Sequence, residues 1–224
     1  MLYTYTETAR AWIRAGHSKL GHALQKYLVE SLQSPSPSVK TGNFEENCSI
    51  ATTIAEYGYS LIGKGDRKEA IRLLEIAFSF HDSVAIRNSL AMMYLKTKQH
   101  AKARKVLIEQ KGKNAYQVAY LALAMLRTTE TNSEEAIATA TALNPRNPVA
   151  WAISSICALD KLSSKERGSV CRDTAENEAR VNVQQAFRCE LCQPVWLLEQ
   201  LSDACLEAGL TELGELCMKR KELK

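Results

Sequence analysis

Apolar residues recur along much of this chain at the three- and four-residue spacing that is typical of amphipathic α-helices. The clearest stretch is residues 51–84, ATTIAEYGYSLIGKGDRKEAIRLLEIAFSFHDSV. Its pattern predicts two short helices joined by a tight turn at residues 63–66. The small residues Gly58 and Ala70 stand where two such helices would cross.

Further copies of this helix pair follow along the chain. Residues 84–116 and 115–145 repeat the order of large and small apolar positions, and residues 144–151, NPRNPVAW, form the junction to the next copy. Proline ends one helix there, while Pro148 suits the first turn of the next helix, where no amide donor is needed. Weaker copies stand at both ends of the chain.

The pattern resembles the tetratricopeptide repeat, W-x2-L-G-x2-Y followed by A-x3-F and P in units of about 34 residues. The resemblance covers about four fifths of the chain and is strongest over residues 51–158. It implies an all-α fold in which antiparallel helix pairs stack into a right-handed superhelix. The same architecture follows from the amphipathic pattern, because one pair cannot bury both of its apolar faces and needs neighbours to cover them.

We predict five segments on this basis. They are an amino-terminal helical pair of divergent sequence (1–33), a Ser/Pro-rich loop (34–50), core repeats (51–161), an irregular loop (162–175), and a carboxyl-terminal repeat with its capping helix (176–224). Residues 162–175, LSSKERGSVCRDTA, are assigned to a loop because they show no amphipathic face. The two Ser-Pro pairs in the first loop are either phosphorylation sites or simply part of a mobile connection.

The resemblance also separates core positions from groove positions. The expected core residues are Ile54, Tyr57, Gly58, Leu61, Leu90, Ala91, Tyr94, Leu121, Ala122 and Trp151. The opposite face of each first helix would line a concave groove, which places there Thr52, Ala55, Tyr59, Asn88, Met92, Lys96, Ala119, Leu123 and Leu126.

This predicted groove is rich in apolar residues. Some family members grip a terminal carboxylate through Lys, Asn and Arg side chains, but the matching places hold Ala55, Tyr59, Ser89 and Ala85, so the clamp is missing. We therefore expect an adaptor, scaffold or chaperone-like module that binds an apolar or amphipathic segment of a partner protein. In the alternative, the protein's own loop or a neighbouring helix covers these residues.

The charge balance changes this interpretation little. Lys and Arg number 29 against 25 Asp and Glu, a net charge of +4 that does not by itself indicate nucleic acid. Residues 96–105, KTKQHAKARK, carry six basic side chains without interleaved aromatic residues. Two further functions remain alternatives: a structural subunit of a larger or homo-oligomeric assembly, and a helical repeat that contacts RNA through this basic segment.

The cysteines and the amino terminus indicate a compartment. The seven cysteines are an odd number and several lie in apolar helical patterns, as expected for reduced thiols that pack as small hydrophobic groups. The chain begins without the basic start and apolar core of a signal peptide, and no apolar run reaches the length of a membrane span. We expect a cytoplasmic protein, with the nucleus as an alternative.

No motif for catalysis or cofactor binding is found. Cys189 and Cys192 have the spacing of a zinc-binding pair, but a structural zinc site normally needs a second pair, so buried or surface thiols are the competing interpretation. The four histidines form no HExxH pair, and the sequence contains no phosphate-binding glycine loop and no GxSxG. We therefore expect no enzymatic activity, no cofactor and no metal.

Overall fold

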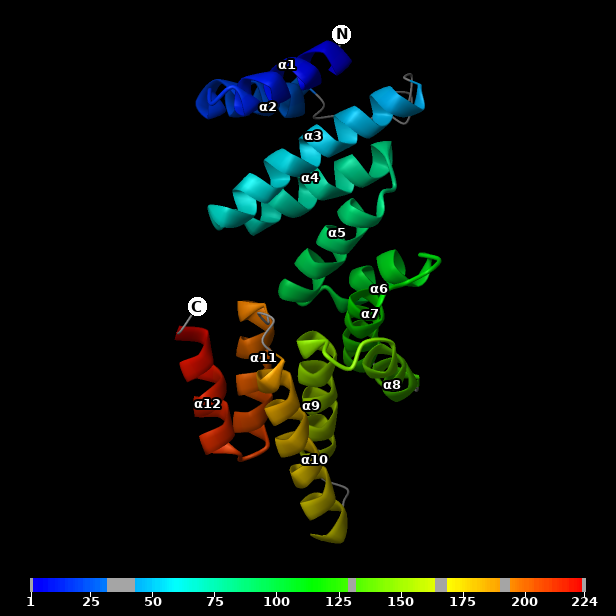
Figure 1. The fold of residues 1–224 in the computed structure, drawn as a ribbon, viewed down its shortest axis with the longest axis vertical. Helices are drawn as coiled ribbons and strands as arrows, with labels where there is room; N and C mark the ends of the chain where they lie inside the picture. Colours follow the sequence, from blue (N-terminus) through cyan, green and yellow to red (C-terminus); the bar gives the residue numbers. More distant parts are fainter. Residues whose placement is uncertain (1, 32–42, 129–131, 164–168, 190–193, 223–224) are drawn as a thin grey trace. The chain divides into compact units, whose positions relative to one another are not determined.

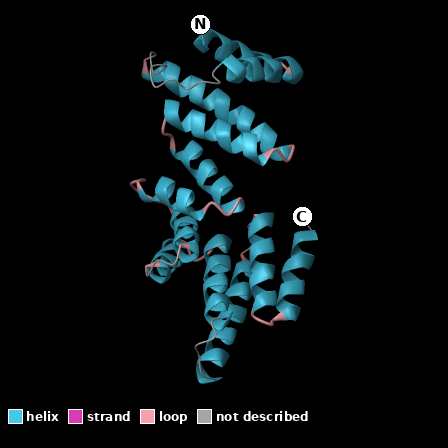
Figure 2. Cartoon of the chain, turned by 180° about the vertical axis from the view of Figure 1, so that it is seen from behind, coloured by secondary structure: helices cyan, strands magenta, loops and turns pink. Residues whose placement is uncertain are grey.

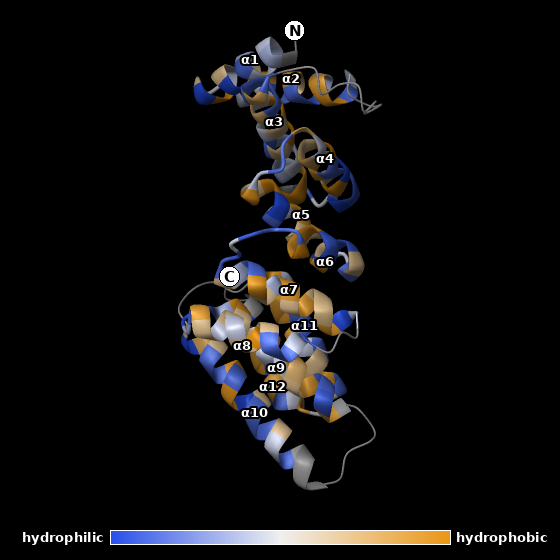
Figure 3. Cartoon of the chain, turned by 90° about the vertical axis from the view of Figure 1, so that its right-hand side faces the viewer, coloured by the Kyte–Doolittle hydropathy of each residue, from blue (hydrophilic) through white to orange (hydrophobic). Residues whose placement is uncertain are grey.

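The computed structural model describes residues 2–31, 43–128, 132–163, 169–189 and 194–222. In these residues every regular element is an α-helix and no strand is present (Figures 1 and 2). Hydrophilic and hydrophobic residues alternate along most helices, as the sequence pattern predicts (Figure 3). None of the described helices is both long and apolar enough to cross a membrane. The chain divides into two compact units, Met1–Tyr94 and Leu95–Lys224, called here the first and the second unit.

The first unit is built from antiparallel helix pairs (Figure 1). Its helices are α1 (Leu2–Arg14), α2 (Ser18–Ser31), α3 (Phe44–Gly63) and α4 (Arg67–Phe80), together with most of α5 (Val84–Lys96). Helix α1 pairs with α2 and α3 pairs with α4, while α1 and α2 also pack on α3. Leu73 and Leu74 of α4 are fully buried, so α4 supplies much of this core.

The turn between α3 and α4 is confirmed where the sequence predicts it. Gly65 has a φ of +85°, a conformation that a glycine adopts without steric cost. The side chain of Asp66 then accepts a hydrogen bond from the backbone N–H of Glu69 and caps α4. Gly58 and Ala70 meet at the crossing, since a Cβ on Gly58 would lie 3.5 Å from the Ala70 carbonyl oxygen.

The second unit is centred on one long helix. Its helices are α6 (His100–Ile108), α7 (Ala115–Arg127), α8 (Ser133–Leu143), α9 (Pro148–Ser163), α10 (Ser169–Arg188), α11 (Val195–Glu207) and α12 (Thr211–Glu222). Helix α9 packs against α7, α8, α10 and α11, and α12 pairs with α11 (Figure 1). Ile153, Ile156 and Leu159 of α9 are fully buried and form the middle of this core.

The junction before α9 has the structure that its two prolines predict. Pro148 is the first residue of α9, and the Asn147 side-chain oxygen accepts hydrogen bonds from the N–H groups of Val149 and Ala150 at 3.0 and 3.4 Å. Trp151 donates its indole N–H to the carbonyl oxygen of Pro145 at 2.8 Å, which ties the helix to the preceding loop.

Most of the expected core is buried. The buried residues are Ile54, Gly58, Leu90, Ala91, Tyr94 and Ala122, and the half-buried ones are Tyr57, Leu61, Leu121 and Trp151. Each of these side chains therefore lies at least partly in the interior.

Two predicted loops are shorter than expected. Helix α3 already begins at Phe44, because Asn43 caps its first turn and Glu45 and Glu46 suit the positive end of a helix.

The second predicted loop, residues 162–175, is also partly helical, since α9 continues to Ser163 and α10 begins at Ser169. The early part of α10 contains the exposed Asp173 and Thr174. A helical turn with exposed polar side chains shows no apolar stripe in the sequence, which is why this stretch was assigned to a loop. Residues 34–42, with both Ser-Pro pairs, and 164–168 lie outside the described residues.

Candidate partner-binding surface

The nine residues predicted to line a groove have very different exposures. Tyr59 is the most exposed, at 37%. Five of the others are half-buried: Thr52, Asn88, Met92, Lys96 and Leu126. The remaining three are buried: Ala55, Ala119 and Leu123.

The expectation that Ala55, Ala119 and Leu123 line an open groove is wrong. Their exposed fractions are 2%, 0% and 0%, so they belong to the core. The physical reason is that a first helix of a repeat contacts its own partner helix and also the helices of neighbouring repeats, so more than one of its faces is covered. The predicted groove consequently loses most of its apolar character.

Tyr59 and its neighbours on α5 form one continuous surface of the first unit. The hydroxyl oxygens of Tyr59 on α3 and Ser89 on α5 hydrogen-bond at 3.0 Å, which places these faces of the two helices side by side. Asn88 and Met92 lie on the same stretch of α5, with Met92 about one helical turn after Ser89. We call the set Tyr59, Asn88, Ser89 and Met92 the Tyr59 surface.

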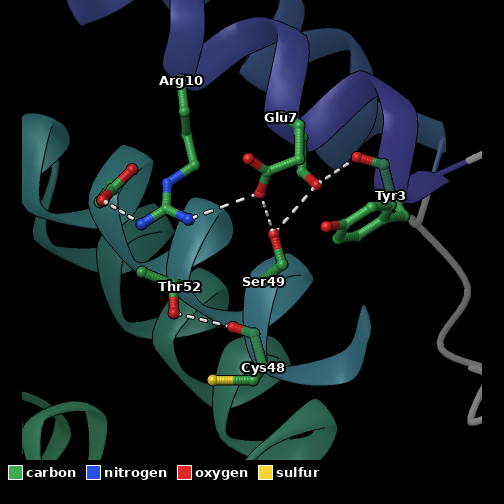
Figure 4. Close-up of polar contacts among 8 residues, drawn as sticks. Tyr3, Glu7, Arg10, Cys48, Ser49 and Thr52 are labelled. Atoms are coloured by element: carbon green, nitrogen blue, oxygen red, sulfur yellow. Dashed lines mark hydrogen bonds and ion pairs between the residues drawn. The ribbon is translucent and has the colours of Figure 1, made fainter. Parts of the chain in front are cut away.

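A polar seam joins α1 to the part of α3 that precedes Tyr59 (Figure 4). Ser49 on α3 donates to the Glu7 carboxylate on α1 at 2.7 Å, and Arg10 reaches both Glu7, at 3.6 Å, and Glu56, at 3.5 Å. Glu56 precedes Tyr59 by three residues and so lies one turn away on a neighbouring part of the helix. The exposed face of α3 is therefore ionic at one end and aromatic at the other.

Sequence reasoning missed this seam. Glu7 and Arg10 have the spacing of an ion pair within one helix, but their partners Ser49 and Glu56 lie more than 40 residues away. Thr52, which the sequence places in the groove, is half-buried, and its hydroxyl donates to the carbonyl oxygen of Cys48 in its own helix (Figure 4).

The basic segment at residues 96–105 forms the turn before α6 and most of α6 itself, in the second unit. Lys98, Lys102 and Lys105 are exposed, and Lys98 adopts a φ of +59° in the turn. Burial lowers the pKa of His100, and the nearby charges of Arg127 and Lys98 lower it further. His100 therefore contributes little positive charge near neutral pH.

A cavity of about 320 Å³ lies over α9 between α8 and α10. Lys161 and Glu134 form an ion pair at 2.7 Å at one end, and Asn182 donates to Ser154 at 3.0 Å in its wall. Burial raises the pKa of the Cys157 thiol in this cavity. The thiol is therefore protonated near neutral pH and is a poor nucleophile.

The cysteines that the structure describes are buried or half-buried free thiols. Cys205 on α11 and Cys217 on α12 are fully buried and their thiols hydrogen-bond, which raises the pKa of Cys217 and lowers that of Cys205. Cys189 is half-buried, while Cys192, the other half of the predicted zinc-binding pair, lies outside the described residues. Among the residues that the structure describes, no three His, Cys, Asp or Glu side chains gather as a metal site.

Packed helix pairs, a glycine turn and a proline junction define an all-α helical-repeat protein with a tetratricopeptide-like fold. The structure is similar to that of a tetratricopeptide repeat protein from Parabacteroides merdae ATCC 43184, with a TM-score of 0.50 and 14% sequence identity over 99% of this chain and 92% of that chain. The sequence matches no protein-family model and no curated protein. At this identity the likeness concerns the fold alone.

Proposed function

We propose that the chain is a protein-interaction module that binds a segment of a partner protein across the Tyr59 surface. The observation that carries this proposal is the Tyr59–Ser89 contact, which joins an exposed tyrosine on α3 to the face of α5 that carries the half-buried Met92. Tyrosine offers a large contact area at low conformational cost, and methionine adapts its shape to a partner. The proposed function includes no catalytic step.

The chemistry of the surface favours an amphipathic segment over a purely apolar one. Apolar side chains of the partner would contact Tyr59 and Met92, while Asn88 and the Arg10–Glu56 pair would meet polar groups or exposed backbone. Ala55, Ala119 and Leu123 take no part in this contact because they are buried.

Affinity capture from native lysate, with mass spectrometry of the bound proteins, tests the proposal. We would compare the wild type with a Tyr59→Glu/Met92→Glu double variant, which places two charges in the contact. The matched control is Leu20→Glu on α2, where the leucine is 56% exposed and outside the Tyr59 surface. Circular dichroism first establishes that all three proteins are folded.

We expect a partner that the wild type and Leu20→Glu capture and that the double variant loses. A partner retained by the double variant would rule out the Tyr59 surface. Binding would then have to use other faces of the chain, as the alternative of a subunit within a larger assembly requires.

A further inference from the structure

A second cavity, of about 220 Å³, lies among α1, α2 and α3 of the first unit. Its lining is dominated by groups that donate hydrogen bonds or carry positive charge. The lining residues are Arg10, Ile13, Arg14, His22, Gln25 and Glu56.

Gln25 is the unusual residue of this cavity. It is only 1% exposed, and its side-chain Nε2 has no hydrogen-bond partner within the described part of the chain. A buried amide donor without an acceptor is costly, and such groups normally find a partner in the protein, in ordered water or in a ligand. Gln25 therefore contributes a buried donor without a described acceptor to the wall of the cavity.

The packing of α1 against α2 holds Gln25 in place. Gly21 lies one helical turn before it, and a Cβ at Gly21 would stand only 2.8 Å from the carbonyl oxygen of Ala9. The two helices thus approach closely at this point, which restricts any movement that would bring Gln25 to an acceptor in its own chain.

The charges around Gln25 favour an anion. Arg14 is exposed and forms no ion pair with the residues that the structure describes, while Arg10 shares its guanidinium between Glu7 at 3.6 Å and Glu56 at 3.5 Å. Glu56 is the carboxylate in the cavity lining, and Glu7 and Glu56 together neutralise Arg10, so Arg14 supplies the positive charge that remains for a ligand. Guanidinium groups match the geometry of carboxylate and phosphate oxygens, and His22 adds a further ring N–H.

We propose that this cavity binds a single oxyanion, the carboxylate or phosphate group of a ligand. Gln25 Nε2 and the Arg14 guanidinium donate hydrogen bonds to the oxyanion. Arg10 offsets the negative charge of Glu56, which would otherwise repel the oxyanion. The oxyanion comes either from a free ion in solution or from an acidic or phosphorylated side chain of a partner. Glu56 lies one turn from Tyr59, so a segment bound on the Tyr59 surface is close enough to supply such a side chain.

Isothermal titration of the purified full chain with inorganic phosphate, at ionic strength held constant with chloride, tests the site. The variants are Gln25→Leu, which keeps the size of the side chain and removes the donor, and Arg14→Gln, which removes the unpaired charge. The matched control is Arg67→Gln, an exposed arginine at the start of α4.

We expect phosphate to bind the wild type and Arg67→Gln equally, and to bind Gln25→Leu and Arg14→Gln about tenfold more weakly. Gln25→Leu should melt no lower than the wild type, because it removes an unpaired buried donor. This melting curve separates loss of the site from loss of the fold.

Absence of phosphate binding by the wild type would overturn the proposal, as would an equal loss in Arg67→Gln, which would indicate a general charge effect. The source of the oxyanion is decided by partner capture with Gln25→Leu. Weaker capture assigns the oxyanion to a partner side chain, and unchanged capture beside lost phosphate binding assigns it to a free ion. The titration uses no partner, so its result is independent of whether the Tyr59 surface binds one.

Discussion

Two glycines in the first unit differ sharply in how closely a neighbouring helix approaches them. A Cβ at Gly21 would lie 2.4 Å from Ile13 Cγ1 and 2.8 Å from the Ala9 carbonyl oxygen, whereas a Cβ at Gly58 would meet its nearest atoms at 3.5 Å. At Gly21 the added methyl group would clash with both the Ile13 side chain and the Ala9 backbone. At Gly58 it would make ordinary van der Waals contact. Only Gly21 is therefore required by packing.

We predict opposite effects for alanine at these two positions. Gly21→Ala should lower the free energy of unfolding by about 1–3 kcal/mol because α1 and α2 must move apart. Gly58→Ala should raise it by about 0.5–1 kcal/mol, since alanine favours the helix and the site has room for its methyl group. Urea denaturation followed by circular dichroism measures both. Equal destabilisation would show that the α3–α4 crossing is as tight as the α1–α2 crossing.

At the scale of helices, a partly buried hydrogen bond joins α4 to α5. Tyr94 donates its hydroxyl to the Glu75 carboxylate at 2.5 Å. Burial raises the pKa of Tyr94 well above its usual value near 10, and the hydrogen bond and charge of Glu75 raise it further. The folded protein thus holds the tyrosine proton more strongly than the unfolded chain does.

The alkaline stability of the protein should depend on this bond. A raised folded pKa means that the stabilisation is complete below the unfolded value of about 10 and is lost as the pH rises from there toward the folded value. Tyr94→Phe should lower the free energy of unfolding by about 1 kcal/mol near neutral pH, and its stability should then fall less steeply above about pH 10. Urea denaturation across this pH range tests it; parallel curves for both proteins would contradict the prediction.

At the scale of the whole chain, the two units have separate cores. Leu73 and Leu74 are buried in the first unit, and Leu123, Ile153 and Ile156 are buried in the second. In a repeat protein, stability comes mainly from contacts between neighbouring helices, so a defect is felt most by the helices around it.

Leu123→Ala should therefore act locally. We expect a loss of about 2–5 kcal/mol for a fully buried leucine. Hydrogen exchange should become faster in α7, α8 and α9 and stay unchanged in α3 and α4. Exchange measured by mass spectrometry on peptides of both units tests this, and an unchanged stability would return Leu123 to an exposed, groove-lining position.

Features that depend on near neighbours in the chain were predicted well. The α3–α4 turn at Gly65, the helix start at Pro148 and the burial of Ile54 and Leu90 follow from backbone preference and apolar spacing within a few residues. The start of α3 was missed, because a short, exposed and acidic first turn resembles a polar loop. The start of α10 was missed because its first residues show no apolar stripe in the sequence.

The sequence by itself therefore determined that the chain forms packed helix pairs, because helix formation, capping and amphipathic spacing are local properties. Only the tertiary structure decided which helix faces remain open. Burial of Leu123, the Tyr59–Ser89 contact and the arginines around Gln25 all depend on how separate helices pack against one another. One apolar face specifies that a helix packs, but the number of neighbours that cover its other faces is set by the assembled fold.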